Sequence, residues 1–106
     1  MPELTSPFAG KPISRADANR LAYTVKALAD PARLQLLSLL ASGGERTNLE
    51  LIQALGWLSQ PTVSHHLRIL ADAGFIVRRA EGNFVYNRLA PAAVAAVAYA
   101  LRPGRR

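Results

Sequence analysis

Residues Leu58–Phe75 read LSQPTVSHHLRILADAGF, and this stretch has the features of a capped helix with one buried face. Ser59 is suited to the N-cap, where its hydroxyl accepts a hydrogen bond from a free backbone N–H of the first turn. Pro61 falls in that first turn, where its missing N–H costs nothing. Gly74 follows the last turn and suits the left-handed conformation that commonly ends a helix. The apolar side chains that recur at helical spacing are Val63, Leu67 and Leu70.

The opposite face of this helix is polar, and its short side chains lie near the N-terminus. Such a face is suited to the major groove of DNA, where short polar side chains and a cation reach base edges and phosphates. An ordinary amphipathic helix with a solvated polar face has the same pattern, and such helices are common. The neighbouring segments decide between these two interpretations. The polar positions are Gln60, Thr62, Ser64, His65 and Arg68.

A second capped segment lies directly upstream. Thr47–Glu50 reads TNLE, a capping box that opens a short helix. Residues 56–58 then form a tight turn that begins with glycine. Two helices joined by such a turn, the second with a polar N-terminal half, are typical of a helix-turn-helix. The inward face of the short helix carries Leu51, Ile52 and Leu55.

A hairpin is predicted directly downstream. Residues 75–77 are β-branched or aromatic, and residues 84–89 alternate between two faces. Glu81-Gly82-Asn83 supplies the turn between them. A hairpin that follows a recognition helix is a wing, and its arginines are candidates for phosphate or minor-groove contacts. A plain surface role is nearly as common for such residues. They are Arg78, Arg79 and Arg88.

The rest of the chain predicts helices on both sides of this unit. Ser14 with Asp17 resembles a capping box and opens a first helix, and Asp30-Pro31 starts a second. The second helix is apolar nearly all round, as a central helix should be. Its apolar residues are Leu34, Leu37 and Leu40, with Leu36 and Leu39 beside them. Pro91 opens a last helix over residues 92–101 that is rich in Ala and Val.

These elements form one domain over residues 14–101. Residues 1–13 contain several prolines and no sustained periodicity, which predicts a flexible N-terminal arm. Residues 102–106 form a basic tail. A chain of 106 residues suits one small domain with a modest core.

Composition narrows the choice of partner. The chain carries 13 Lys plus Arg against 7 Asp plus Glu, a net charge of +6, which favours nucleic acid or an anionic surface. The absence of Cys excludes disulfides and thiolate metal sites. There is neither an apolar run long enough to span a membrane nor a signal-peptide pattern at the N-terminus. We therefore expect a cytoplasmic protein with no membrane partner.

Catalysis is not indicated. Ser64 and His65 are consecutive on a helix, so they cannot form a nucleophile–base hydrogen bond. The sequence also lacks paired carboxylates, a phosphate-cradling glycine loop and a metal-ligand cluster. We expect neither an enzyme nor a bound cofactor.

Three motifs in this order give the chain a resemblance to the ArsR/SmtB family of bacterial winged-helix repressors. They are LADPARL at residues 28–34, QPTVSHHL at residues 60–67, and ADAGFI at residues 71–76 with the hairpin ending at Tyr86. The resemblance covers residues 18–101. It implies a mainly α winged helix-turn-helix with element order α-α-α-α-β-β-α. It also implies a homodimer packed through the first and last helices, and repression by operator binding that an effector releases.

The resemblance and the residue chemistry together give two sets of site residues. The dimer interface is expected at Leu21, Val25, Val94, Val97, Tyr99 and Leu101. Contacts to a double-stranded DNA operator are expected from Ser59, Gln60, Thr62, Ser64, His65, Arg68, Arg78, Arg79 and Arg88. The alternative is a winged-helix protein-interaction module without DNA binding. The polar face argues against it, because a protein interface favours apolar or aromatic anchors.

The sequence departs from the family in two places. The turn before the recognition helix, Gly56–Ser59, holds one residue more than the usual Gly-x-Ser. The family's metal sensors place Cys in the third helix or Asp, His and Glu in the last one, and neither set is present here. We therefore expect no metal site, and the effector remains unknown. Three further residues are expected to be structural: Arg33 as a hydrogen-bond donor, His66 as a partly buried side chain and Trp57 as a packing residue.

Overall fold

The computed structural model describes residues 12–101, which form five helices and three strands. The elements are α1 (Arg15–Lys26), α2 (Pro31–Ala41), β1 (Arg46–Thr47), α3 (Asn48–Leu55), α4 (Gln60–Asp72), β2 (Ile76–Glu81), β3 (Phe84–Leu89) and α5 (Pro91–Ala100). The predicted order of helices and hairpin is confirmed, and the fold is a winged helix-turn-helix. Most of the predicted arm and the whole basic tail lie outside the described residues.

The helices begin where the capping residues indicated. Ser14, Asp30, Thr47 and Ser59 are the N-caps of α1, α2, α3 and α4, and each side chain accepts a hydrogen bond from a backbone N–H of the first turn. At Thr47 both halves of the capping box are present. Helix α4 ends at Gly74, where φ is +87°. There the N–H groups of residues 74 and 75 donate to the carbonyls of residues 71 and 70, which is a Schellman motif.

The sheet is antiparallel, with the strand order β1-β3-β2. The hairpin pairs Arg79 with Tyr86 and Arg78 with Asn87. Strand β2 continues to Glu81, beyond the apolar run at residues 75–77 from which it was predicted. Strand β1 was not predicted, because two residues are too few to give a periodicity. It pairs Thr47 with Tyr86, so the N-cap of α3 also lies on the sheet.

The core lies between the three helices of the body and the start of the hairpin. Its fully buried side chains come from α2, α3, α4 and the segment that follows α4. The predicted stripe of α4 is confirmed, and so is the burial of Leu51. The fully buried apolar side chains are Ala32, Leu36, Leu40, Leu51, Val63, Leu67, Leu70 and Phe75.

The apolar residues of α2 are not equally buried. Leu34 is 52% exposed, whereas Leu36 and Leu40 are almost completely buried. Because α2 is apolar nearly all round, its sequence does not select one face over another. Packing against α4 and β3 selects the face instead, and Leu34 is left at the surface.

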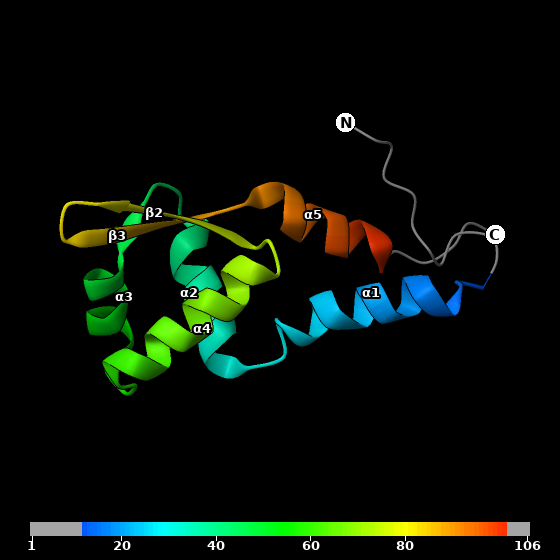
Figure 1. The fold of residues 1–106 in the computed structure, drawn as a ribbon, viewed down its shortest axis with the longest axis horizontal. Helices are drawn as coiled ribbons and strands as arrows, with labels where there is room; N and C mark the ends of the chain where they lie inside the picture. Colours follow the sequence, from blue (N-terminus) through cyan, green and yellow to red (C-terminus); the bar gives the residue numbers. More distant parts are fainter. Residues whose placement is uncertain (1–11, 102–106) are drawn as a thin grey trace.

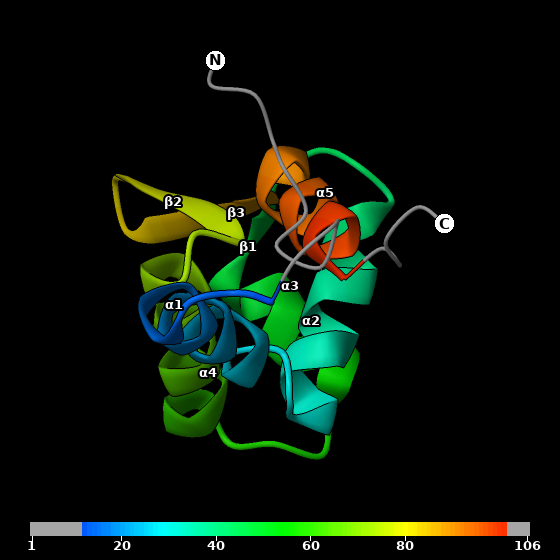
Figure 2. The same ribbon diagram turned by 90° about the vertical axis from the view of Figure 1, so that its right-hand side faces the viewer.

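Helices α1 and α5 lie outside the compact body. Figure 1 shows both extending from the α2–α3–α4 body and the hairpin in the same direction, and Figure 2 views the pair from the end. The two helices contact each other. Neither contains a fully buried residue, so their apolar side chains remain partly or largely exposed in the single chain. None of the helices in residues 12–101 has the length and hydropathy needed to span a bilayer.

Candidate nucleic-acid interface

Helix α4 presents its polar face to solvent because its opposite face is buried in the core. Val63, Leu67 and Leu70 have no exposed surface. On the outer side, Gln60, His65 and Arg68 are exposed, together with the N-cap Ser59, while Thr62 and Ser64 are partly buried. The structure thus brings the predicted residues of α4 together on one surface.

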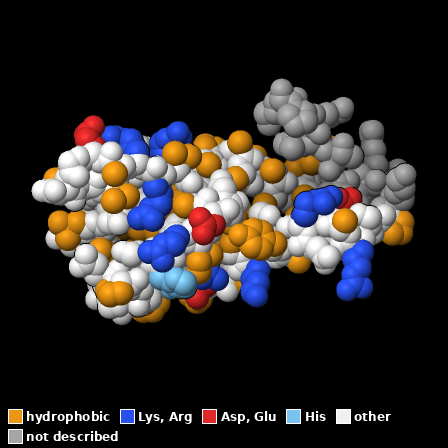
Figure 3. Space-filling model, viewed as in Figure 1, with side chains coloured by type: hydrophobic (Ala, Val, Ile, Leu, Met, Phe, Trp, Pro, Cys, Tyr) orange, Lys and Arg blue, Asp and Glu red, His pale blue; other side chains and the backbone are white. Residues whose placement is uncertain are grey.

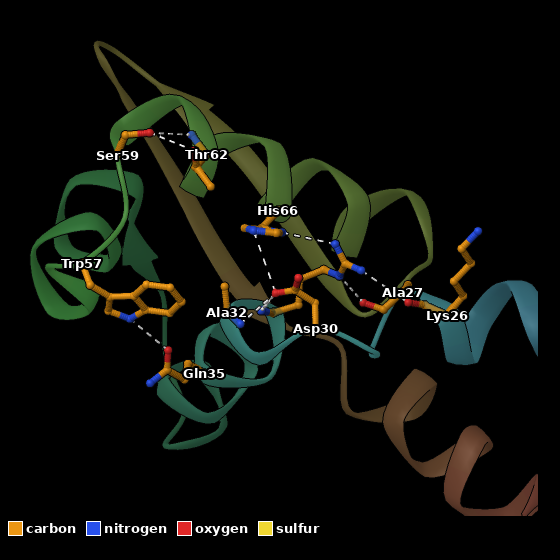
Figure 4. Close-up of polar contacts among 10 residues, drawn as sticks. Lys26, Ala27, Asp30, Ala32, Gln35, Trp57, Ser59, Thr62 and His66 are labelled. Carbon is orange, nitrogen blue, oxygen red and sulfur yellow. Dashed lines mark hydrogen bonds and ion pairs between the residues drawn. The ribbon is translucent and has the colours of Figure 1, made fainter.

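The first turn of α4 is stabilised by two of these residues. Ser59 Oγ lies 2.9 Å from Thr62 Oγ1 and 3.4 Å from the backbone N of Thr62 (Figure 4). The Ser59 hydroxyl therefore caps the helix, and the Thr62 hydroxyl is its hydrogen-bond partner. The positive end of the helix dipole lies at this turn, which favours a nearby phosphate.

The wing, residues 76–89, does not present its arginines equally. Arg88 is exposed. Arg79 donates from Nε and Nη2 to the two carboxylate oxygens of Glu45, each at 2.8 Å, and from Nη1 to Glu81 at 3.1 Å. Its guanidinium also lies 4.4 Å from the centre of the Tyr86 ring. The hydrogen bonds from Arg79 lower the pKa of Glu45, so that carboxylate stays charged. The charge of Arg79 is therefore offset by two carboxylates.

Arg78 lies on the inner face of the wing. Its Nε donates to Asn87 Oδ1 at 2.9 Å and its Nη2 to Asn48 Oδ1 at 3.3 Å. Asn87 is fully buried, and its Nδ2 donates to Asn48 Oδ1 and to the Arg46 carbonyl. Burial lowers the pKa of Arg78, and the nearby Arg68 lowers it further. This polar cluster joins the wing to β1 and α3, and the sequence pattern gave no sign that Asn87 is buried.

A groove separates the wing tip from the start of α4. It has a volume of about 240 Å³. Gln60 lines it from α4, and Asn83 and Phe84 line it from the wing. Phe84 is 51% exposed and Leu49, on the α3 side, is 53% exposed. Sequence reasoning missed Asn83 and Phe84 as candidate contacts, although their position at the predicted turn placed them at the wing tip.

Positive side chains are gathered on the face that carries α4 and the wing. Figure 3 shows Lys and Arg side chains over the hairpin and beside α4, together with a His side chain. Acidic side chains are fewer on this face. A surface of this kind fits the regularly spaced phosphates of a nucleic acid.

The inner side of α4 contacts Arg33 of α2, which in turn donates hydrogen bonds to the end of α1. The His66 side chain is 12% exposed, and its Nδ1 lies 3.2 Å from Arg33 Nη1. Arg33 also donates from Nε to the Ala27 carbonyl at 2.7 Å (Figure 4). The structural roles predicted for Arg33 and His66 are confirmed. Burial lowers the pKa of His66, although the nearby Asp30 carboxylate acts in the opposite direction.

The packing role predicted for Trp57 was wrong. Its side chain is 59% exposed in the turn between α3 and α4. Its indole Nε1 donates to Gln35 Oε1 at 3.2 Å, so a polar contact with α2 holds the ring at the surface. The hydrogen bond joins α2 to the turn that has one residue more than the family pattern.

The expected dimer residues lie on α1 and α5. Leu21, Val25, Val97 and Tyr99 are partly buried in the single chain, while Val94 and Leu101 are 40% and 49% exposed. Within residues 12–101 no group of three or more His, Asp or Glu side chains is arranged to hold a metal ion.

Known proteins share this fold and sequence pattern. Residues 30–77 match the family model described as bacterial regulatory protein, arsR family. The chain is 45% identical over 69 residues to an uncharacterized HTH-type transcriptional regulator of Methanocaldococcus jannaschii, covering 63% of this chain and 76% of the relative. It is 46% identical over 66 residues to the arsenic resistance transcriptional regulator ArsR1 of Pseudomonas putida, covering 62% of this chain but only 51% of that protein.

Solved structures extend the comparison to the whole fold. The homodimeric winged helix-turn-helix DNA-binding domain of a possible ArsR-family regulator from Mycobacterium bovis is 34% identical, with a TM-score of 0.69. The match covers 85% of this chain and 83% of that one. These relatives are named as transcriptional regulators, and none is named as an enzyme. The chain belongs to the ArsR family of bacterial regulatory proteins.

Proposed function

We propose that the protein is a cytoplasmic transcriptional repressor that binds an inverted-repeat DNA operator as a homodimer. The observation that carries this proposal is the outer surface of α4. Its exposed Gln60, His65 and Arg68 lie opposite a fully buried apolar stripe, next to a wing with positive side chains. A recognition helix in the major groove uses such a face.

The proposed contacts divide by chemistry. Gln60 pairs with adenine in the major groove, and His65 contacts a neighbouring base edge. Ser64 contacts a phosphate or a base edge, and Arg68 and Arg88 contact phosphates. Ser59 and Thr62 contribute the capped N-terminus of α4, which favours a phosphate. Arg78 and Arg79 remain in the proposed site, but their hydrogen bonds to Asn87 and Glu45 give them the task of holding the wing in place.

Dimerisation is proposed through the side-by-side helices α1 and α5. Their exposed apolar side chains, including Val94 and Leu101, would become buried between two copies. A two-fold dimer places two α4 helices on one side of the duplex, so the half-sites should lie about one helical turn apart, roughly 34–36 Å. The homodimeric relative supports this arrangement.

The release mechanism differs from that of a thiolate sensor. Relatives are named for arsenic and mercury resistance, but soft metals and arsenite bind thiolates, and this chain has no Cys. We propose that the protein does not sense these species through its own side chains. Any effector then acts by another chemistry.

A protein-interaction module is the second candidate, and one observation favours it. Phe84 and Leu49 line the groove at the wing tip and are both about half exposed, so they offer two apolar contacts to a partner. A partner would have to use this groove rather than the polar face of α4.

The deciding experiment is selection of bound DNA from a random duplex library, read by sequencing. Enrichment of an inverted repeat with two similar half-sites is the expected result. Enrichment of no motif, at a salt concentration where nonspecific binding is weak, would remove DNA recognition from the proposal and leave the interaction module.

A further inference from the structure

The Arg33 bridge joins the end of α1 to the recognition helix, and it consists of Lys26, Ala27, Arg33 and His66. Arg33 Nε donates to the Ala27 carbonyl at 2.7 Å, and Nη2 donates to the Lys26 carbonyl at 3.4 Å. These carbonyls lie at the C-terminal end of α1, and the Lys26 carbonyl also accepts from the backbone N–H of Ala29 at 3.1 Å. The third contact, from Nη1, reaches His66 Nδ1 on α4 at 3.2 Å.

The chemistry of the bridge fixes the charge and the tautomer of the His66 imidazole. A guanidinium can only donate hydrogen bonds, so Nδ1 of His66 must accept, and the ring must be neutral with its proton on Nε2. That Nε2 faces Asp30, whose carboxylate oxygen lies 3.9 Å away and caps α2 (Figure 4). The imidazole is thus oriented from both sides by residues at the start of α2.

Because His66 lies on α4, the bridge holds the helix that carries the proposed DNA contacts. His66 is adjacent to His65 and lies within one turn of Ser64 and Arg68 on the same helix. The apolar stripe of α4 holds the helix against the core, but hydrophobic contacts are not directional and tolerate small rotations. A directional hydrogen bond at His66 limits rotation of α4 about its axis, and hence the direction of the outer side chains.

Helix α1 is the element through which this control can be exerted. It has no fully buried residue, and it packs against α5, which is the other proposed dimer helix. A shift of α1 on dimerisation moves the Lys26 and Ala27 carbonyls, which hold two of the three guanidinium nitrogens of Arg33. The third nitrogen then moves relative to His66.

We propose that Arg33 is a positioning residue that couples the packing of α1 in the dimer to the orientation of the recognition helix. This inference rests on the proposed function, since it assumes dimerisation through α1 and DNA contact through α4. Coupling of this kind is reciprocal: operator DNA tightens the dimer by the same factor by which dimerisation tightens DNA binding.

The variants separate the bridge from general stability. Arg33→Lys keeps the charge but loses the planar fork that reaches both α1 and His66. His66→Leu removes the acceptor, whereas His66→Asn places an amide oxygen close to the position of Nδ1 and should restore the contact. Arg20→Gln is the control for substitution of an arginine outside the bridge, because Arg20 is exposed and pairs with Asp17 on α1.

The first measurement does not use DNA. Amide hydrogen exchange of α4 is compared between the dimer and a dilution at which the dimer dissociates. In wild type, Arg20→Gln and His66→Asn, dissociation should raise the exchange rates of the α4 amides. In Arg33→Lys and His66→Leu, the rise in these rates on dissociation should be at least tenfold smaller than in wild type. An unchanged response in Arg33→Lys, with the fold intact by circular dichroism, would overturn the coupling.

The second measurement uses the selected operator. The dimer dissociation constant is measured by sedimentation with and without DNA. The tightening seen in wild type should fall at least tenfold in Arg33→Lys, and the Arg33→Lys/His66→Leu double variant should be no worse than either single one. Additive losses would overturn the proposal.

If no operator is selected but the exchange result holds, the proposed function fails and the coupling stands. If wild type binds its operator and Arg33→Lys changes neither measurement, the coupling fails and the function stands.

Discussion

Arg79 and Glu45 form a two-point ion pair that ties the outer face of the wing to the loop before β1. Arg79 Nε and Nη2 each lie 2.8 Å from a different oxygen of the Glu45 carboxylate. Such a fork fixes direction as well as distance. The sequence predicted Arg79 as a phosphate contact, but in the folded chain its guanidinium already has carboxylate partners.

This ion pair predicts that a second substitution, at Glu45, restores DNA affinity lost by substitution of Arg79. Arg79→Ala should weaken binding to all DNA sequences similarly, because it leaves Glu45 and Glu81 as unpaired negative charges near the phosphates. The Glu45→Gln/Arg79→Ala double variant should recover most of the affinity. Both are checked by titration of operator and unrelated DNA at several salt concentrations. A double variant as weak as Arg79→Ala would instead indicate a direct phosphate contact, with the salt slope reduced by about one.

The polar face of α4 predicts a different kind of loss. Gln60→Ala and His65→Ala should relax specificity at one base pair of each half-site, costing about 1–3 kcal/mol where the contact is bidentate. Binding to unrelated DNA should change little. Competition between the operator and single-base variants measures this effect. Wild-type discrimination in both variants would mean that another surface reads the bases.

Asn87 carries a prediction about stability. Asn87→Leu keeps the size of the side chain but removes the partners of Arg78 Nε and the Arg46 carbonyl. Because Asn87 is fully buried, each group left without a partner should cost about 1–3 kcal/mol. Urea unfolding monitored by circular dichroism gives the value. Asn83→Ala, at the exposed turn of the wing, is the control and should change stability by less than about 0.5 kcal/mol.

Local chemistry determined what could be read from the sequence. The helix starts were predictable because Ser14, Asp30, Thr47 and Ser59 are capping residues that act within one turn. The buried stripe of α4 was predictable because polar residues separate its apolar positions. Helix α2 has no such contrast, and its buried face depends on tertiary packing.

The missed features are those that depend on distant partners. Asn87 is buried because Asn48 and Arg78, from two other elements, supply its hydrogen bonds. Arg79 is paired because Glu45 lies beside it only after β1 joins the sheet. Trp57 stays exposed because Gln35 on α2 accepts its N–H. None of these distant pairings leaves a pattern in the local sequence.

The buried imidazole of His66 predicts a pH dependence of folding. Burial lowers its pKa below the ordinary value of 6.5, so the unfolded chain binds a proton more readily than the folded one just below pH 6.5. The stability from neutral His66 is therefore fully present above pH 6.5 and falls as the pH drops through the lowered pKa. Urea unfolding of wild type and His66→Asn, measured between neutral and mildly acidic pH, checks this.

The His66→Asn variant supplies the contrast for that measurement. Its side-chain amide does not titrate, so the stability of the variant should be nearly flat over the same range. The pKa of Asp30 is also lowered. Desolvation raises this pKa, but the backbone hydrogen bonds that the carboxylate accepts outweigh that effect. That group matters only below its ordinary value of 3.8, where its stabilising charge is lost on protonation. Equal pH slopes in wild type and variant would show that His66 is not the group responsible.

The last prediction concerns the effector. Zinc sites need several Cys, His or carboxylate ligands that converge on one point, and soft metals or arsenite need thiolates. The chain has no Cys and only His65 and His66 as histidines. These two are consecutive on α4, and one is directed outward while the other contacts Arg33. Both ring nitrogens of His66 are directed at protein groups, Nδ1 at Arg33 and Nε2 at Asp30, so neither is directed at an ion shared with His65.

Operator affinity should therefore be the same with zinc, nickel, arsenite or peroxide as with a chelator. The measurement is a DNA titration under each condition, with an ArsR relative that contains its thiolates as the positive control. A reproducible tenfold loss of affinity at micromolar metal, about 1.4 kcal/mol of coupling, would contradict the prediction. In that case His65→Ala should be tested next, because His65 is the exposed histidine on the proposed DNA-binding face. A metal effect that survives this substitution would require ligands outside α4.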